Sequence, residues 1–202
     1  MNGLVLCLDA GNRKSYPGSG TTWTDLSGRG NNGTLTNGPT YSNGAIVFDG
    51  VDDYVGFTTV SVQTVCFRGR TDTDMTNLGA LVATSNNADG SLRIDNNSGQ
   101  SFRFTPDSND FHNGYVSSFM INGVSNLSNN GSGGLSIPNG RTLRQDFYVG
   151  AIGNARNIST ISHTYLGRAY KGRVYAVYLY NRQLTNAELL QNYLATKSRF
   201  GL

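Results

Sequence analysis

The sequence predicts an all-β fold: a two-sheet antiparallel β-sandwich with one short C-terminal α-helix. Two observations carry this prediction. The composition favours strands and turns, with 26 Gly, 11 Tyr and 9 Phe and only 14% charged residues among the 202. In addition, many short apolar runs are separated by Gly- and Asn-rich turns, with no alternation of helices and strands. A chain of this length is predicted to form one domain over residues 1–202.

The predicted strands are runs of strand length that alternate in polarity or are apolar throughout. They cover residues 4–8, 45–48, 54–57, 60–67, 78–83, 91–94, 101–104, 119–124, 147–150 and 174–180. The pair Asn122-Gly123 can supply the two positive-φ residues of a type I′ hairpin, which predicts a tight turn there.

The closing run, 174–180, is apolar on both faces, as expected for a strand inside a sandwich. Strict alternation places Val174, Ala176, Tyr178 and Tyr180 on one face. Tyr175, Val177 and Leu179 then occupy the other face.

The C-terminal helix is predicted from its start signal. Thr185 and Glu188 have the spacing of a capping box, and Leu184 and Leu189 stand at the positions of a hydrophobic staple. Four residues then repeat at helical spacing and predict an apolar face: Leu189, Leu190, Tyr193 and Leu194. Gly201 is suited to end the helix.

Charge and hydropathy exclude two classes of partner. The net charge of +3 is scattered, without a basic run interleaved with aromatic residues, so no nucleic-acid role is expected. No apolar stretch reaches membrane-spanning length, and no secretion signal is recognised, so we expect synthesis in a cytoplasm or a piece trimmed from something longer. Cys7 and Cys66 lie in apolar runs and are expected to be free thiols, unless their strands face each other closely enough for a disulfide.

The long polar segments 9–44 and 125–140 are predicted to be loops, and loops on a rigid scaffold are where binding usually resides. Three loop aromatic residues are the candidate ligand contacts: Phe111, Tyr115 and Tyr165. Trp23 is expected to pack beneath the first loop instead of contacting a ligand.

Two blocks of the sequence resemble a known family. Residues 23–33, followed by 48–55, look like the N-terminal half of laminin-G-like, concanavalin A-like lectin domains. Residues 170–175 and 180–188 look like their closing strand and helix, and the ending 191–202 is similar to versions carried by tailed-bacteriophage virion proteins. The resemblance implies a jelly-roll sandwich and a lectin-like, carbohydrate-binding or structural role.

Catalysis is not expected. Glycoside hydrolysis generally needs two carboxylates on either side of the scissile bond, and the only glutamate, Glu188, is accounted for by the capping box. The two histidines, His112 and His163, lack the spacing of a zinc site or a nucleophilic triad. We therefore expect no enzymatic activity.

Calcium is the one cofactor for which the sequence offers ligands. Carboxylates stand at the bases of loops, with Asp9, Asp49 and Asp52 as the candidate ligands, and Asp25 and Asp53 close to the same segments. The favoured interpretation is that these side chains hydrogen-bond their own turns, as Asp commonly does in Gly-rich loops.

The function expected from these observations is that of a non-enzymatic phage virion protein: a capsid decoration, fibre-associated or host-adhesion module. Its expected partners are capsid or tail proteins and host-surface glycans, and it is expected in multiple copies. The alternative is a carbohydrate-binding module of a secreted bacterial enzyme or adhesin.

Overall fold

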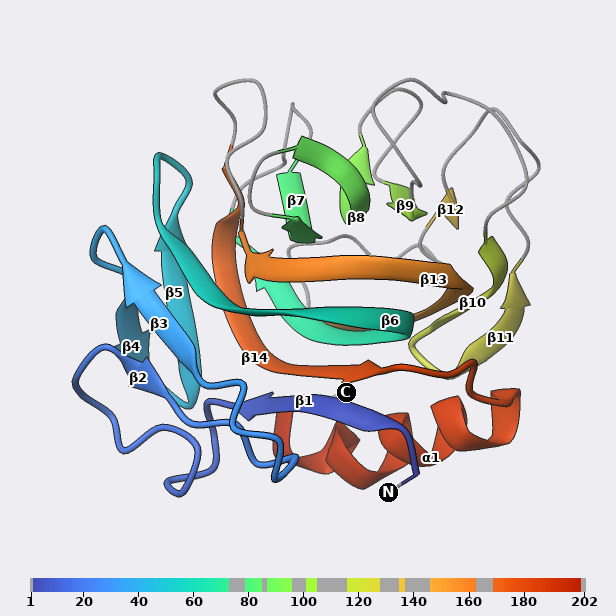
Figure 1. Cartoon of the computed structure of the whole chain (residues 1–202), viewed down its shortest axis with the longest axis horizontal. Helices are drawn as coiled ribbons and strands as arrows, with labels where there is room; N and C mark the ends of the chain where they lie inside the picture. Colours follow the sequence, from blue (N-terminus) through green and yellow to red (C-terminus); the bar gives the residue numbers. More distant parts are fainter. Residues whose placement is uncertain are drawn as a thin grey trace.

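The computed structural model describes residues 2–72, 79–84, 87–95, 101–104, 116–127, 135–136, 146–162 and 169–200. The fold is all-β with one short C-terminal helix, as predicted (Figure 1). The strands are β1 (Leu4–Asp9), β2 (Thr22–Trp23), β3 (Gly33–Thr36), β4 (Thr40–Ser42), β5 (Ala45–Asp49), β6 (Tyr54–Thr71), β7 (Gly79–Thr84), β8 (Asn87–Asp95), β9 (Ser101–Phe104), β10 (Val116–Ile121), β11 (Val124–Leu127), β12 (Leu135–Ser136), β13 (Phe147–Ile161) and β14 (Lys171–Tyr180). The helices are α1 (Asn186–Lys197) and a 3₁₀ turn, η2 (Ser198–Phe200).

The strands form a curled antiparallel network in which β6, β13 and β14 are central. β6 pairs with β13 along one edge and with β14 along the other. β14 in turn pairs with β5 through its first half and with β1 through its second half. In Figure 1, β13, β6, β14 and β1 cross the middle of the molecule side by side, and α1 lies below them.

Two strands are longer than the sequence predicts. The runs 54–57 and 60–67 belong to one bent strand, β6, whose pairing with β13 resumes after a register shift at the residues between them. β13 likewise extends from the predicted run 147–150 through a polar stretch to Ile161, where it also pairs with β7. β6 and β13 each pair with more than one strand, and these backbone hydrogen bonds hold polar residues in the sheet. Hydrophobic periodicity in the sequence does not reveal such pairing.

The main core lies between the inner faces of the curled sheet. Trp23, Phe48, Phe67 and Tyr170 are among its largest fully buried side chains. The rings of Phe67 and Phe147 stack with centroids 6.0 Å apart, and Tyr170 meets Phe67 edge-on. Trp23 therefore packs in the core, as predicted, and is not available to a ligand.

A second, smaller core lies between the outer face of the sheet and α1. The sheet contributes Cys66, Tyr148 and Tyr180, and the helix contributes Leu189 and Tyr193. This layer explains why the strands in the middle of the sheet are apolar on both faces.

Arg68 is fully buried in this second layer, on β6. Its Nη2 donates a hydrogen bond of 2.9 Å to the backbone oxygen of Tyr193 on α1. The guanidinium carbon lies 5.4 Å from the ring centroid of Tyr148 and 5.6 Å from that of Tyr193. Burial lowers the pKa of Arg68, and contact with aromatic faces and a helix carbonyl offsets part of the cost of burying its charge.

The predicted faces of β14 are correct only for its second half. A bulge between Val174 and Ala176 shifts the register against β6. Val174 consequently joins Val177 and Leu179 in the main core, although strict alternation assigns it to the opposite face. A bulge adds one residue to one strand and so inverts the alternation that the sequence pattern assumes.

The start of α1 is as predicted, but its buried face is not. Thr185 is the N-cap, and the reciprocal hydrogen bonds with Glu188 form the capping box. The staple residues Leu184 and Leu189 are both buried. The buried face is rotated toward Leu189, Tyr193 and Thr196.

Leu190 and Leu194, predicted to lie on the buried face, are 39% and 53% exposed. The α-helix ends at Lys197, and the 3₁₀ turn η2 follows it directly. Gly201, predicted to end the helix, lies outside the described residues. The rotation places the smaller Thr196 against the sheet in place of the two leucines.

The segment 9–44 is not simply a loop, since it contains β2, β3 and β4. These strands are two to four residues long, below the length at which alternation is detectable. The Asn122-Gly123 turn, by contrast, is as predicted: both residues have positive φ, 50° and 86°, between β10 and β11.

The two cysteines are free. Cys7 and Cys66 each pair with Tyr178 of β14, from its two sides. They are therefore two strands apart, roughly 9–10 Å at the usual spacing between strands. A disulfide requires Cα atoms within about 7 Å, so the alternative of a bridge does not apply.

Candidate functional site

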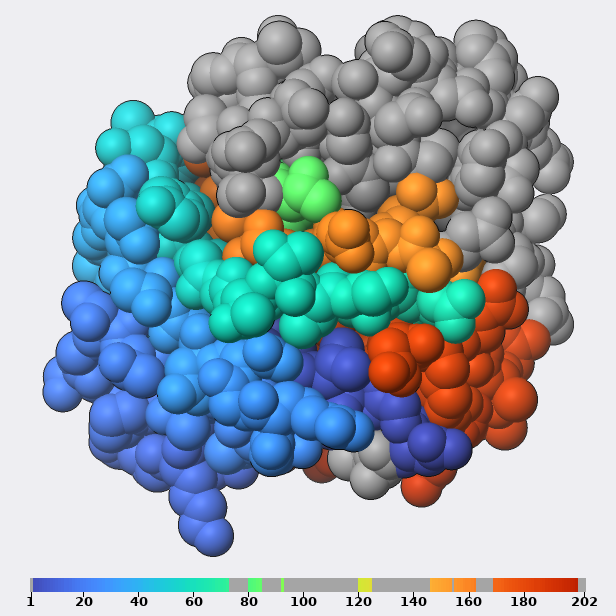
Figure 2. All heavy atoms as spheres, viewed as in Figure 1, coloured from blue at the N-terminus to red at the C-terminus, as the bar shows by residue number. Residues whose placement is uncertain are grey.

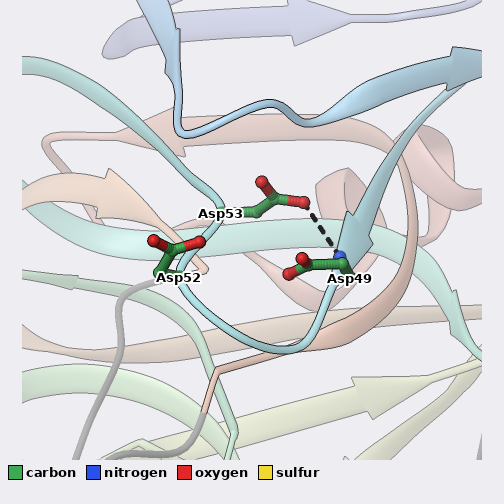
Figure 3. Close-up of side chains that lie close together, drawn as sticks. All are labelled: Asp49, Asp52 and Asp53. Atoms are coloured by element: carbon green, nitrogen blue, oxygen red, sulfur yellow. Dashed lines mark hydrogen bonds between the residues drawn. The ribbon is translucent and has the colours of Figure 1, made fainter.

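The acidic turn between β5 and β6 brings together two of the three candidate calcium ligands. Oxygen atoms of Asp49, Asp52 and Asp53 lie within 4.8 Å of one another (Figure 3). Asp53, which stands in the same segment of the sequence, is buried, with only 3% of its surface exposed. Asp49 and Asp52 are exposed. Two of the three candidate ligands therefore lie together, with Asp53 beside them.

The hydrogen bonds of this cluster belong to its own turn. Asp53 Oδ2 accepts from the backbone N–H of Asp49 at 2.9 Å, and Asp49 Oδ1 accepts from that of Val51 at 2.8 Å. Burial raises the pKa of Asp53, and the nearby carboxylates of Asp49 and Asp52 add to this effect. These bonds are what the favoured interpretation, a self-stabilised turn, expects. Calcium binding remains a prediction.

Asp9, the third candidate ligand, lies at the end of β1 and is not part of this cluster. Its two carboxylate oxygens accept hydrogen bonds of 2.8 and 2.9 Å from the guanidinium of Arg199. Asp9 is 5% exposed, so this two-pronged ion pair fastens the C-terminal η2 segment to β1.

The Asp25 carboxylate also has a structural role, through hydrogen bonds to neighbouring segments. Its carboxylate accepts four hydrogen bonds, two of them 2.8 Å long from the backbone N–H groups of Cys7 and Ser27. The others come from the Ser27 hydroxyl and the Asn31 backbone. The carboxylate thus organises the loop that follows β2 and ties it to β1.

The aromatic candidates Phe111, Tyr115 and Tyr165 lie outside the described residues, as do His112 and His163. Their predicted roles stay predictions. The described parts of the segment 125–140 are the end of β11 and the short β12.

The sequence did not single out a pocket that the fold forms beside α1. It has a volume of about 310 Å³ and lies between the N-terminal residues, the end of β14 and the helix. Its lining residues are Asn2, Tyr180, Arg182, Leu184, Glu188, Gln191, Asn192 and Ala195. We call it the helix pocket. Figure 2 shows the N-terminal residues, in dark blue, beside the C-terminal residues, in red.

The wall of the helix pocket is held in place by Arg182. Its Nη1 and Nη2 donate to the two oxygens of Glu188, and its Nε donates to the backbone oxygen of Asn2 at 3.0 Å. The side chain also packs over Gly3, where an added Cβ would lie 2.8 Å from the Arg182 Cγ. The N-terminus, β14 and α1 are thereby joined at one point.

A second hollow, more open, lies beside β1 and β6. Val5 and Val60 supply apolar contacts, and Arg29, Ser61 and Asn181 supply polar groups. None of the three clustered aspartates lines either hollow.

The sequence matches no protein-family model and no curated protein. Among solved structures, the fold is similar to a sialidase from Trypanosoma rangeli in complex with sialic acid, with a TM-score of 0.56 and 18% identity over 98% of this chain and 33% of that one. The chain thus spans about a third of the length of the sialidases that it matches.

A second similar structure matches along its whole length. This is domain 4 of AbnA, a GH43 extracellular arabinanase from Geobacillus stearothermophilus, in complex with arabinotriose. The TM-score is 0.59, with 14% identity over 93% of this chain and 97% of that domain. At these identities the likeness shows the fold, a β-sandwich that occurs within glycan-processing enzymes.

Proposed function

We propose that this domain is a non-catalytic carbohydrate-binding β-sandwich. The observation that carries the proposal is the whole-length structural likeness to the arabinanase domain, whose structure contains arabinotriose. That structure is one domain of an enzyme, and it matches this chain in size.

The arrangement of acidic groups supports a role without catalysis. Glu188 is the only glutamate in the chain, and its oxygens are taken by Arg182 and by the backbone and hydroxyl of Thr185. Asp49 and Asp53 accept hydrogen bonds within their own turn, and none of the clustered aspartates lines either hollow described above. A glycosidase pair needs two carboxylates facing a substrate cleft, one as acid and one as base or nucleophile.

The setting that we propose is the surface of a bacteriophage particle. The resemblance of the segment 191–202 to versions of the domain carried by tailed-bacteriophage virion proteins supports a capsid decoration, fibre-associated or host-adhesion role, with capsid or tail proteins as partners. The protein would be made in the host cytoplasm and carried on the particle in many copies. None of the helices in the described part of the chain is long and apolar enough to cross a membrane.

The alternative setting is a module of a secreted bacterial enzyme or adhesin, which the likeness to a domain of an extracellular arabinanase supports. Finding the chain in purified particles by mass spectrometry supports the virion, whereas a catalytic domain encoded in the same gene supports the secreted module.

Carbohydrate binding is tested with a glycan array probed by the domain displayed on beads. We expect binding to a restricted set of glycans and no release of sugar from them. Uniformly negative arrays would contradict binding, and release of reducing sugar would contradict the non-catalytic role.

A further inference from the structure

We infer that the helix pocket is a binding site for one neutral sugar unit of a glycan. The inference rests on the proposed function and gives it a place in the fold. It is built on the size, the charge balance and the unused hydrogen-bonding groups of the pocket.

The size of the pocket suits a single sugar ring. Its volume of about 310 Å³ lies at the lower end of the range of small-molecule sites, roughly 300–1,000 Å³. Tyr180 and Leu184, exposed by only 2% and 5%, provide a rigid, mostly apolar floor. Ala195 is exposed and leaves room above this floor, because its side chain is a single methyl group.

The charges of the pocket cancel within it. Arg182 and Glu188 make two hydrogen bonds to each other, and the other side-chain hydrogen bonds of Arg182 go to backbone oxygens of Asn2 and Gln183. Glu188 also accepts from the backbone N–H of Thr185 at 2.8 Å. An anionic ligand would have to displace Glu188 from Arg182, and a cationic one would have to displace Arg182 from Glu188. The pocket therefore favours an uncharged ligand.

Three amide side chains of the lining have hydrogen-bonding groups to spare. Asn192 Nδ2 donates to the hydroxyl of Tyr180 at 3.0 Å and to Cys66 Sγ at 3.7 Å, which fixes the orientation of the amide. Its Oδ1 accepts nothing from the described residues. Within the same part of the chain, the side-chain amides of Asn2 and Gln191 form no hydrogen bond either.

An apolar floor with amide donors and acceptors around it is complementary to a sugar ring. The C–H face of a pyranose or furanose packs on apolar surface, and its hydroxyls pair with amide groups that both donate and accept. A peptide segment is the competing occupant, since amides also pair with backbone, and the test distinguishes the two.

The test compares two tryptophan substitutions on the same helix. Ala195→Trp fills the helix pocket, whereas Ala187→Trp changes an exposed alanine of α1 that does not line it. The probes are methyl glycosides of glucose, galactose, mannose, arabinose and N-acetylglucosamine, with methyl glucuronide as the charged comparison. Binding is followed by NMR through the side-chain amide signals of Gln191 and Asn192, at millimolar ligand.

We expect at least one neutral glycoside to shift these signals in the unmodified domain and to bind at least tenfold more weakly to Ala195→Trp. Ala187→Trp should bind like the unmodified domain, with an unchanged thermal midpoint. Gln191→Ala alters only an exposed side chain and should weaken binding several-fold, so it decides the matter if Ala195→Trp does not fold.

Glycan binding that Ala195→Trp and Gln191→Ala leave unchanged would overturn the inference and leave the proposed function intact. A preference for the glucuronide would overturn the neutral class. Binding of a particle-protein peptide, but of no glycoside, to the pocket would overturn the sugar as occupant. Absence of binding to every glycan, also on beads, would overturn the proposed function together with the inference.

Discussion

Glu188 contacts two residues at the start of α1, Thr185 and Arg182. It closes the capping box with Thr185, and its oxygens accept hydrogen bonds from the guanidinium of Arg182. The second contact completes the wall of the helix pocket. A single carboxylate thus joins the N-terminus of the helix to the end of β14 and, through Arg182, to the start of the chain.

Replacing Thr185 by Ala should destabilise the protein by about 1 kcal/mol, because the backbone N–H of Glu188 loses its side-chain acceptor. Chemical denaturation at equilibrium measures the change, and Thr185→Ser, which keeps the hydroxyl, should remain close to the unmodified protein. An unaltered denaturation midpoint in the alanine variant would show that the cap contributes little.

Glu188 should also make stability depend on pH. The side chain of Arg182 and the backbone N–H of Thr185 lower the pKa of Glu188 from 4.5 to about 2. A carboxyl whose pKa falls on folding stabilises the native state above its unfolded pKa, and this contribution is lost as the pH falls toward the folded value. Its size is reduced by solvent, because about a third of the side chain is exposed.

We expect the loss of unfolding free energy between neutral pH and about pH 3 to be smaller in Glu188→Gln than in the unmodified protein. Urea denaturation at the two pH values measures the difference. Equal losses in both proteins would mean that the ion pair is not coupled to folding.

The two thiols should be unreactive in the native protein and reactive after unfolding. Burial is the main cause that raises the pKa of Cys7 to about 12 and that of Cys66 to about 11, so both are protonated at neutral pH. Titration with a thiol reagent should find two groups in denaturant without reductant and very slow reaction in buffer. Detection of fewer than two in denaturant would contradict the free-thiol state.

At the scale of elements, β6 and β14 approach so closely that glycine is required in their pairing. Gly69 lies opposite Val174, and Gly172 lies opposite Thr71. The hydroxyl of Tyr170 lies over this region and donates to the backbone oxygen of Arg70 at 2.7 Å. The bulge that redirects Val174 into the core begins at the same place.

Gly172→Ala should therefore be strongly destabilising, by about 3 kcal/mol or more. A Cβ at this position would lie 2.2 Å from the backbone oxygen of Arg70 and 2.8 Å from the Cα of Thr71, and φ is +153°. Gly20→Ala is the matched control, since Gly20 also has a positive φ, +91°, but an added Cβ meets nothing within 4 Å. Similar thermal midpoints for the two variants would refute the steric explanation.

At the scale of the whole molecule, the proposed binding is expected to be weak for one copy. Among the described residues, the lining of the helix pocket offers amide groups and a small apolar floor, without a large aromatic anchor at the mouth. A dissociation constant near ~1 mM follows for a site of this kind. Useful adhesion then requires many copies on one scaffold, where effective concentration raises avidity ~100-fold or more.

Isolated domain should consequently bind host cells poorly, and the same domain on multivalent beads should bind well. Flow cytometry with labelled monomer and labelled beads measures both. Tight binding by the monomer would contradict the weak single site, and no binding in either format would favour a purely structural role in the capsid.

The sequence by itself determined the all-β class, the position of most strands, the Asn122-Gly123 hairpin and the capped start of α1. Each of these depends on interactions within a few residues: alternation along a strand, a positive-φ turn, and a side chain that reaches the third backbone N–H beyond it. It also offered Asp49 and Asp52 as carboxylates of one turn, and in the structure their oxygens lie close together.

Tertiary structure alone decided the continuous β6, the bulge in β14, the buried position of Arg68 and the face of α1 that docks. It also formed the ion pair between Asp9 and Arg199, which are 190 positions apart, and the helix pocket, which needs Asn2 beside Arg182. The physical reason is shared. Such contacts depend on strand register and on how the layers pack, and a single inserted residue in one strand exchanges the faces of everything beyond it.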